Sequence, residues 1–163
     1  MHSGPRRRGR LARAALEERE ETLRGLCFCL IYDLSAWLAR TRRPVPRDLR
    51  EYRLEGARRL ADPGARLRQY IDPALVEHWE QALDPFFRSG ASLSIELGEV
   101  APLEAEGLER GDREVRAELR FSERSSLVDA AGGRHPLPGR DWLLEARVSP
   151  DLTVVENAWI RPV

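Results

Sequence analysis

Side chains that commonly perform chemistry are few in this chain, and their spacing joins none of them into a metal or nucleophile site. Cys27 and Cys29 stand two residues apart in an apolar run. A disulfide framework needs more cysteines at wider spacing, and a metal site needs further ligands nearby. We interpret both as reduced core residues, which favours an intracellular, reducing compartment. His78 has no second His or Cys at metal-ligand spacing, so we place it at the rim of a helix.

Three further polar residues, Asp129, His135 and Asp141, lie beside Gly-Gly or Pro-x-Pro-Gly sequences. Asp and His ordinarily serve turns in such surroundings. The sequence has no Gly-rich phosphate loop, no Gly-x-Ser-x-Gly elbow and no His-rich metal set. We therefore name no catalytic residue and expect neither a cofactor nor a metal ion.

A strand predicted between residues 113 and 121 is the central element of the fold. Its apolar residues fall on one face, and charged residues fall on the other. The apolar positions are Val115, Ala117, Leu119 and Phe121. The pattern allows this strand to continue to Val128, a length that implies a bent strand curling around the helices.

Other strands complete an antiparallel meander. Residues 92–97 alternate apolar side chains inward, and Gly98 suggests a bulge. Trp142 and Trp159 lie in two later strands, and the alternation along each predicts that both indoles share the concave face of the sheet. We expect Trp142 in a filled core and Trp159 at a partly open rim.

A long helix is predicted over residues 10–40, with an apolar stripe at three-four spacing. All seven residues from Leu26 to Tyr32 are apolar, so the helix buries more than one side. We interpret it as a core helix that also binds a partner, rather than a membrane span, because the run between Arg24 and Arg40 reaches only about 22 Å. The candidate partner-binding residues are Phe28, Ile31, Tyr32 and Trp37.

The first half of the chain is basic. Residues 1–68 carry 17 Arg and 9 acids, whereas residues 69–163 carry 10 Arg and 18 acids. We predict a disordered basic arm over residues 1–9 and a second helix from Arg47 onward. One face of that helix carries Arg47, Arg50, Arg53 and Arg58. Acids interleave with these arginines, which favours a solvated face over a nucleic-acid footprint.

A short helix over residues 65–71 leads to Asp72-Pro73, which has the capping residue and the proline typical of a helix start. The third main helix carries Trp79 on its apolar side and stops at Ser89-Gly90. The predicted fold is therefore α+β, with N-terminal helices packed on a curved antiparallel sheet of about four strands. At 163 residues one such domain, over residues 46–163, buries a sizeable core.

This order of elements resembles the cone-shaped nuclear transport factor 2-like fold. Within that superfamily, five segments look like the Tim-forty-four-like domain, named for a peripheral subunit of the mitochondrial inner-membrane protein translocase. The segments are residues 70–79, residues 114–121, residues 127–133, Asp141-Trp142 and Ala158-Trp159-Ile160. The resemblance covers roughly residues 48–163. The chain differs from the family in lacking a clear membrane-spanning start.

The resemblance implies a cone-shaped cavity. Enzymes of the superfamily place an Asp or His inside the cone as general acid or base, and the candidates here are Asp129, His135 and Asp141. Apolar walls of the cavity would come from Trp79, Phe121, Trp142 and Trp159.

The sequence favours a non-catalytic interaction or scaffold domain that docks a protein partner or a second copy of itself. We expect a cytoplasmic location, with peripheral membrane or larger-complex association left open. One alternative is a small-molecule-binding or isomerase/cyclase-type enzyme that uses the cone. Another is weak nucleic-acid binding through the arginine faces, which lack the interleaved aromatic residues of single-strand binders.

Overall fold

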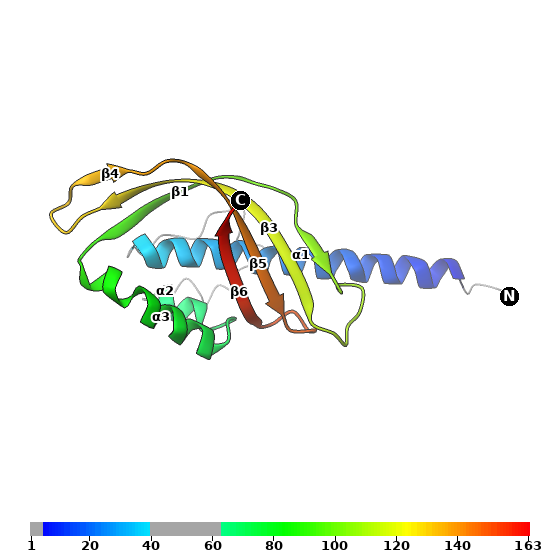
Figure 1. The fold of residues 1–163 in the computed structure, drawn as a ribbon. Coiled ribbons are helices and arrows are strands. Elements are labelled where there is room, and N and C mark those ends of the chain that lie inside the picture. Colours follow the sequence, from blue (N-terminus) through cyan, green and yellow to red (C-terminus); the bar gives the residue numbers. More distant parts are fainter. Residues whose placement is uncertain (1–4, 40–62) are drawn as a thin grey trace.

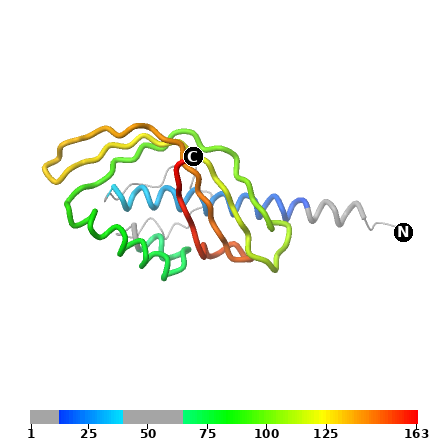
Figure 2. Tube along the Cα trace, in the orientation of Figure 1, coloured from blue at the N-terminus to red at the C-terminus, as the bar shows by residue number. Residues whose placement is uncertain are grey.

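The computed structural model describes residues 5–39 and 63–163, with side chains from residues 13–39 and 65–163. A long N-terminal helix lies across one face of a curved antiparallel sheet, and two further helices close the side of that face (Figure 1). The predicted α+β class is confirmed. In Figure 1 the N-terminal end of the long helix extends beyond the sheet, and Figure 2 shows that the C-terminus lies against the sheet.

Helix α1 spans Pro5–Ala39. The helix includes residues 5–9 of the segment that was predicted as a disordered arm. Proline is well suited to the first turn of a helix, and the arginines that follow are good helix formers, so the chain starts its helix at once. The core side of α1 buries Leu23, Cys27 and Leu30 against the sheet.

Helix α2 spans Pro63–Leu67, and α3 spans Pro73–Arg88. The start of α3 is the one predicted: the Asp72 carboxylate accepts a hydrogen bond from the Ala74 amide at 2.9 Å, ahead of the proline in the first turn. Ser89 caps the other end, and Gly90 follows with φ 77°, a conformation that glycine adopts without steric cost.

Among the residues that the structure describes, the sheet has six strands, with the order β1-β3-β5-β6 and two short strands, β2 and β4, that also pair with β3. The strand bounds are Ser92–Val100 for β1, Glu104–Glu106 for β2, Val115–Val128 for β3, Arg134–Pro136 for β4, Arg140–Val148 for β5 and Val155–Pro162 for β6. All the strand pairs are antiparallel. The three residues of β4 extend the hairpin against the end of β3.

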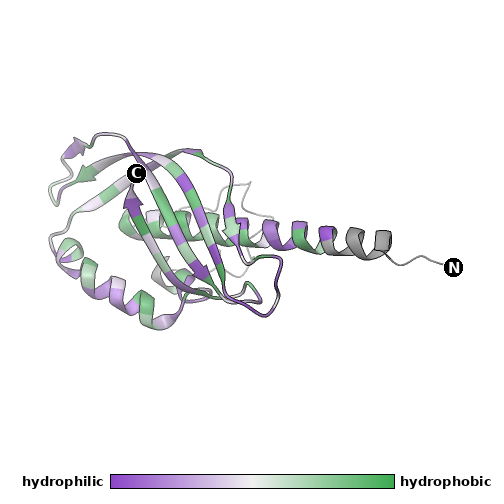
Figure 3. Cartoon of the chain, turned by 45° about the vertical axis from the view of Figure 1, so that its right-hand side comes forward, coloured by the Kyte–Doolittle hydropathy of each residue, from purple (hydrophilic) through white to green (hydrophobic). Residues whose placement is uncertain are grey.

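Strand β3 is the central, bent strand that the alternation predicted. Its inward positions Val115, Ala117 and Leu119 are almost completely buried, and the charged residues between them are exposed. Apolar and polar residues alternate along the strands in Figure 3. The core lies between this inner face and α1, where apolar burial is the main stabilising contribution.

Two bulges interrupt the ladders. The first shifts the β1–β3 register between Leu97 and Val100, next to the predicted position, Gly98. The second lies in β6: Val148 pairs with Val155, but Arg147 pairs with Asn157, so Glu156 is an extra residue. An extra residue reverses which face the following side chains occupy.

Contacts across the fold tie its ends together. The Arg19 guanidinium on α1 donates to the carbonyls of Leu108 at 2.8 Å and Pro150 at 3.1 Å, so it holds two loops at one end of the sheet. At the start of β6, Val155 donates to the Tyr70 carbonyl and accepts from the Asp72 amide. These bonds fix the junction between α2 and α3 against the sheet.

Candidate binding groove

A groove of about 450 Å³ lies between α1, α3 and the inner face of the sheet. Most of its lining is aliphatic or aromatic. The lining residues are Ile31, Leu34, Ser35, Leu38, Trp79, Ala82, Leu83, Leu93, Ile95, Leu97, Phe121, Glu123, Ser125, Leu137, Trp142, Ala158 and Ile160. A concave apolar surface of this size falls in the range of ligand sites, about 300–1,000 Å³.

The sheet places its part of the lining by the two-residue period. Phe121 continues the inward face of β3, and Glu123 and Ser125 follow at the next two inward positions. Trp142 on β5 pairs directly with Phe121, which puts the two rings on the same face. Two elements thereby supply an aromatic wall.

Helix α3 supplies the opposite wall. Trp79, Ala82 and Leu83 are three and four residues apart, so they share one side of the helix. From α1, Ile31 and Leu34 lie at the same spacing. The groove is therefore formed where two helices and the bent sheet diverge, rather than by one element.

Glu123 is the only ionisable side chain among the described residues that line the groove. One carboxylate oxygen accepts a hydrogen bond from the Trp142 indole nitrogen at 2.9 Å, and the other accepts from the Ser125 hydroxyl. These bonds orient the carboxylate at an apolar surface. Such an arrangement can bind an apolar group next to a hydrogen-bond donor or a cation.

The structure brings three of the four predicted aromatic walls together: Trp79, Phe121 and Trp142 all line the groove. The placement of Trp159 on the concave face was wrong. Because of the extra Glu156, Trp159 pairs with Glu145 on the outer face, where its side chain is 44% exposed and the Arg147 guanidinium lies 5.1 Å from its ring centroid. Trp142 is half-buried, packs against the core and also lines the groove.

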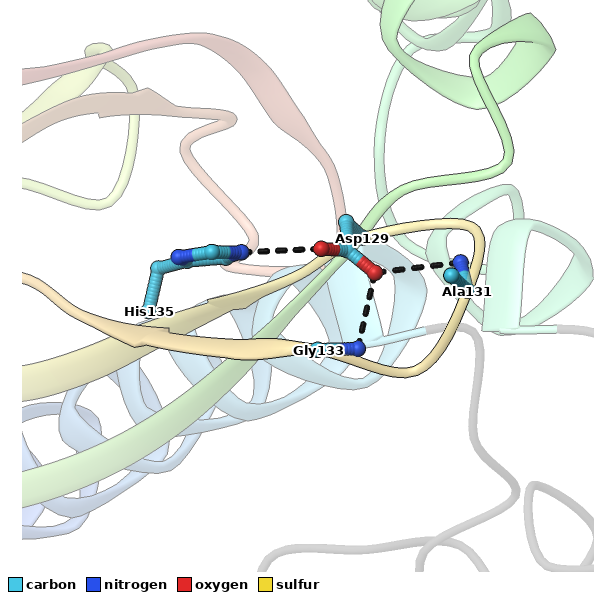
Figure 4. A network of polar contacts seen from close by, with 4 residues as sticks. All are labelled: Asp129, Ala131, Gly133 and His135. Atoms are coloured by element: carbon cyan, nitrogen blue, oxygen red, sulfur yellow. Dashed lines mark hydrogen bonds and ion pairs between the residues drawn. The ribbon is translucent and has the colours of Figure 1, made fainter.

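The acid and base candidates lie outside the groove. Asp129 and His135 form the β3–β4 hairpin end, where Asp129 accepts from the amides of Ala131 at 3.0 Å and Gly133 at 2.7 Å, and from the His135 ring at 2.8 Å (Figure 4). The His135 hydrogen bond is the main cause that lowers the pKa of Asp129, followed by the Gly133 amide. Turn formation explains both residues.

Asp141 is exposed at the start of β5 and pairs with Ser122. It contributes no groove surface. Glu123 and Ser125, which do line the groove, were not among the predicted site residues. A signal was available, because extending the alternation of β3 past Phe121 puts both residues on the inner face.

The four candidate residues on α1 have different surroundings. Ile31 is 2% exposed and lines the groove, so it belongs to the interior rather than to an outer interface. The Trp37 ring lies 5.6 Å from that of Phe87 on α3, centroid to centroid. Phe28 and Tyr32 are half-buried. The predicted arginine face, Arg47, Arg50, Arg53 and Arg58, lies outside the described residues.

Cys27 and Cys29 are buried thiols, as expected of core cysteines. Burial raises the pKa of the Cys27 thiol to about 12, so the thiol stays protonated at neutral pH and unreactive. No group of three or more metal-ligating side chains occurs within the described part of the chain.

One helical stretch, Arg13–Ala39, is long and apolar enough to cross a membrane by length and composition. Of its most apolar window, 56% is buried inside the fold. A core helix that packs on a sheet meets the same criteria, so this finding does not by itself place the chain in a membrane.

No protein-family model matches the chain, and no curated protein matches its sequence. Among solved structures, the chain is similar to the intermembrane space region of the chloroplast protein ARC6, with 11% sequence identity and a TM-score of 0.46. That likeness covers 61% of this chain and 78% of the ARC6 chain. The similarity is too distant to carry an argument about function.

Proposed function

We propose that this chain is a non-catalytic interaction domain that binds an apolar segment of a protein partner in the groove between α1, α3 and the sheet. The observation that carries the proposal is the groove itself: about 450 Å³, with a mainly aliphatic and aromatic lining. A protein partner removes such a surface from water, and the free energy gained is roughly 25 cal/mol per Å² of apolar area.

The rim of the groove supports a protein ligand. Leu137 and Ile160 contribute to the lining and are 44% and 39% exposed. Two more exposed large apolar side chains, Trp159 and Val163, lie in or next to the same C-terminal strand. Exposed apolar side chains at the mouth of an apolar groove are typical of protein interaction sites.

Ala82 offers a test, because it is exposed, lines the groove and sits on a helix. Ala82→Arg places a long charged side chain across the groove without removing a core residue. Gln81→Arg is the matched control: its position is the preceding one on the same helix, it is exposed, and it does not line the groove. Both variants should keep the circular dichroism spectrum and melting temperature of the wild type.

The probe is a library of random dodecapeptides displayed on phage, selected on the immobilised wild-type chain. We expect enrichment of peptides rich in apolar residues that bind the wild type and Gln81→Arg but not Ala82→Arg. Absence of any enrichment, or equal binding to both variants, would contradict the proposal.

A second candidate function is the binding of a small molecule, and two observations favour it. The groove has the volume of a small-molecule site, and its single carboxylate, Glu123, is oriented by Trp142 and Ser125. Such a site suits an apolar molecule with one amine or hydroxyl group, and an isomerase or cyclase would use Glu123 as its acid or base. Native mass spectrometry of the purified chain tests it: a bound species absent from Ala82→Arg supports this candidate.

The family and the location are part of the same proposal. The order of helices followed by a curved sheet supports membership of the Tim-forty-four-like domain within the nuclear transport factor 2-like superfamily. A cytoplasmic location with peripheral membrane association remains a prediction. Nucleic-acid binding through the arginine face is a third option, and a steep loss of affinity with rising salt would identify it.

A further inference from the structure

The outer edge of β6 has backbone groups that do not pair with β5. The Val163 amide donates to the Asp141 carbonyl at 3.0 Å, so Asp141 and Val163 form a hydrogen-bonded pair of the β5–β6 ladder. Hydrogen-bonded and non-hydrogen-bonded pairs alternate in an antiparallel ladder, so Leu144 and Ile160 form a non-hydrogen-bonded pair. The N–H and C=O of Ile160 consequently point away from the sheet.

Other positions on this edge are already occupied or blocked. Val155 is bonded to Tyr70 and Asp72. The outward amide of Ala158 donates to the Asn157 side-chain oxygen at 2.9 Å. Pro162 has no N–H to offer. Within the described residues, the groups left for pairing are thus the N–H and C=O of Ile160 and the outward carbonyls of Ala158 and Pro162, a short stretch at the groove mouth.

Side chains on both faces of the same stretch are apolar and exposed. Ile160 lies on the inner face and lines the groove, whereas Trp159 lies on the outer face. A segment that pairs with β6 would direct alternate side chains toward the groove and toward Trp159, because successive residues of a strand point to opposite faces.

Carboxylates lie in the groove and at the bulged start of this edge, whereas the Arg161 guanidinium next to Ile160 is paired with Glu145. Residues 69–163 carry 18 acids and 10 Arg, and the groove contains Glu123 as its ionisable side chain. At the bulge of β6, the Glu114 carboxyl is hydrogen-bonded to Glu156 and, with burial and the nearby Asp72 carboxylate, raises the pKa of Glu156. A basic segment complements such an edge, since a like-charged one would be repelled.

We propose that the partner is an extended basic segment of another protein, with apolar residues at alternate positions, that adds to the sheet as a strand beside Ile160. This inference rests on the proposed function and specifies its binding mode. Backbone hydrogen bonds to the edge provide affinity, and the groove selects the alternate apolar side chains, as in other strand-addition complexes.

Ile160→Pro tests the backbone pairing. It removes the outward N–H and keeps an apolar side chain. Pro162, two residues further on, also lies in a non-hydrogen-bonded pair, so β6 already accepts a proline at an equivalent position. Ile160→Val is the matched control, because it keeps the N–H. Both variants should melt cooperatively, as checked by circular dichroism.

The probe is a synthetic dodecapeptide from the library selection, titrated by isothermal calorimetry into each full-length variant. We expect Ile160→Pro to raise Kd about tenfold, the effect of leaving a hydrogen-bonding group unpaired, and Ile160→Val to change it little. The selected peptides should show apolar residues with a period of two and an excess of Arg and Lys.

Several results would overturn the inference. If Ala82→Arg abolishes binding while Ile160→Pro does not, the groove binds its partner without strand addition and only the proposed function survives. A selected apolar period of three to four residues would indicate a helical ligand. A dimer in light scattering that Ile160→Pro dissociates would mean that a second copy of the chain occupies the edge.

Discussion

At the scale of single residues, the surroundings of a carboxylate decide its role. Asp129 is held by two backbone amides and His135, all within one hairpin. Its partners are local in sequence, so it serves the turn. Glu123 receives Trp142 from the neighbouring strand and faces an apolar groove. Of these two carboxylates, Glu123 is the one that a ligand in the groove can reach beside an apolar wall.

The titration of Asp129 gives a prediction at this scale. Its pKa is lowered from the ordinary value of 3.8, with the His135 hydrogen bond as the main cause. A depressed carboxyl pKa stabilises the folded hairpin above the unfolded value, and that contribution is lost as the pH falls through the folded value. His135→Ala should therefore move the Asp129 midpoint upward, as followed by the Gly133 amide shift in NMR titrations.

Asp151 serves as the control for this titration. Its pKa is also lowered, but the causes are Ser149 and Thr153. The pH midpoint of the Asp151 titration should not change in His135→Ala. If the Asp129 midpoint also stays unchanged, the hydrogen bond to His135 does not form in solution.

At the scale of elements, bulges decide the fold more than strand propensity does. The bulge in β6 turns Trp159 outward, and the irregularity near Gly98 lets β1 bend along β3. At the bulge near Gly98, the Ser122 hydroxyl accepts a hydrogen bond from the Glu99 amide at 2.9 Å, and this bond satisfies a backbone group that the ladder leaves unpaired.

Gly98→Ala tests the need for close approach at this bulge. A Cβ added at Gly98 would lie 2.4 Å from the Ser122 hydroxyl oxygen, so either that side chain or the strand must move. We expect a loss of about 1–3 kcal/mol in the free energy of unfolding, typical of overpacking, measured by urea denaturation.

Gly111→Ala is the matched control, because an added Cβ meets no atom within 4 Å there. It should be neutral or stabilise by up to about 1 kcal/mol. In the double variant Gly98→Ala/Ser122→Ala the clash is removed, so part of the lost stability should return. An equal effect of both single substitutions would contradict the account of the bulge.

At the scale of the whole molecule, the inner face of the sheet is divided between a closed core and an open groove. Val115, Leu119 and Leu144 pack in the core. Farther along the bent sheet, Phe121 and Trp142 form the groove wall. The groove part of this face is lined by α1 and α3 together with the sheet.

Truncating a side chain in the closed core should lower the free energy of unfolding more than truncating one in the groove wall. Leu144 is 0% exposed, and Leu144→Ala should lower the free energy of unfolding by about 2–5 kcal/mol through the cavity it leaves. Trp142 is half-buried at the groove wall. Trp142→Ala should therefore cost less than about 3 kcal/mol, the lower bound for truncating an aromatic in a closed core, and should weaken peptide binding.

Urea denaturation of both variants, with calorimetric titration of the selected peptide, separates the two roles. If Trp142→Ala unfolds the chain as readily as Leu144→Ala does, the groove is part of the packed core. If it costs little stability and leaves peptide affinity unchanged, Trp142 is not a binding wall.

The sequence by itself determined the features that depend on neighbours along the chain. The alternation of Val115, Ala117 and Leu119 specified a half-buried strand, Asp72-Pro73 specified a helix start, and the glycines beside Asp129 specified a turn. Each is set by backbone geometry and hydrogen bonds within a few residues, so it can be predicted from the sequence without knowledge of the tertiary structure.

Which side chains lie on the same surface depends on the tertiary structure. Whether Trp159 joins Trp142 depended on one extra residue in β6, and a ladder irregularity of that kind leaves no periodic trace in the sequence. The groove itself depended on where α1 and α3 diverge from the bent sheet. Residue types fix how much apolar surface there is, but the packing of separate elements fixes which part of it stays open.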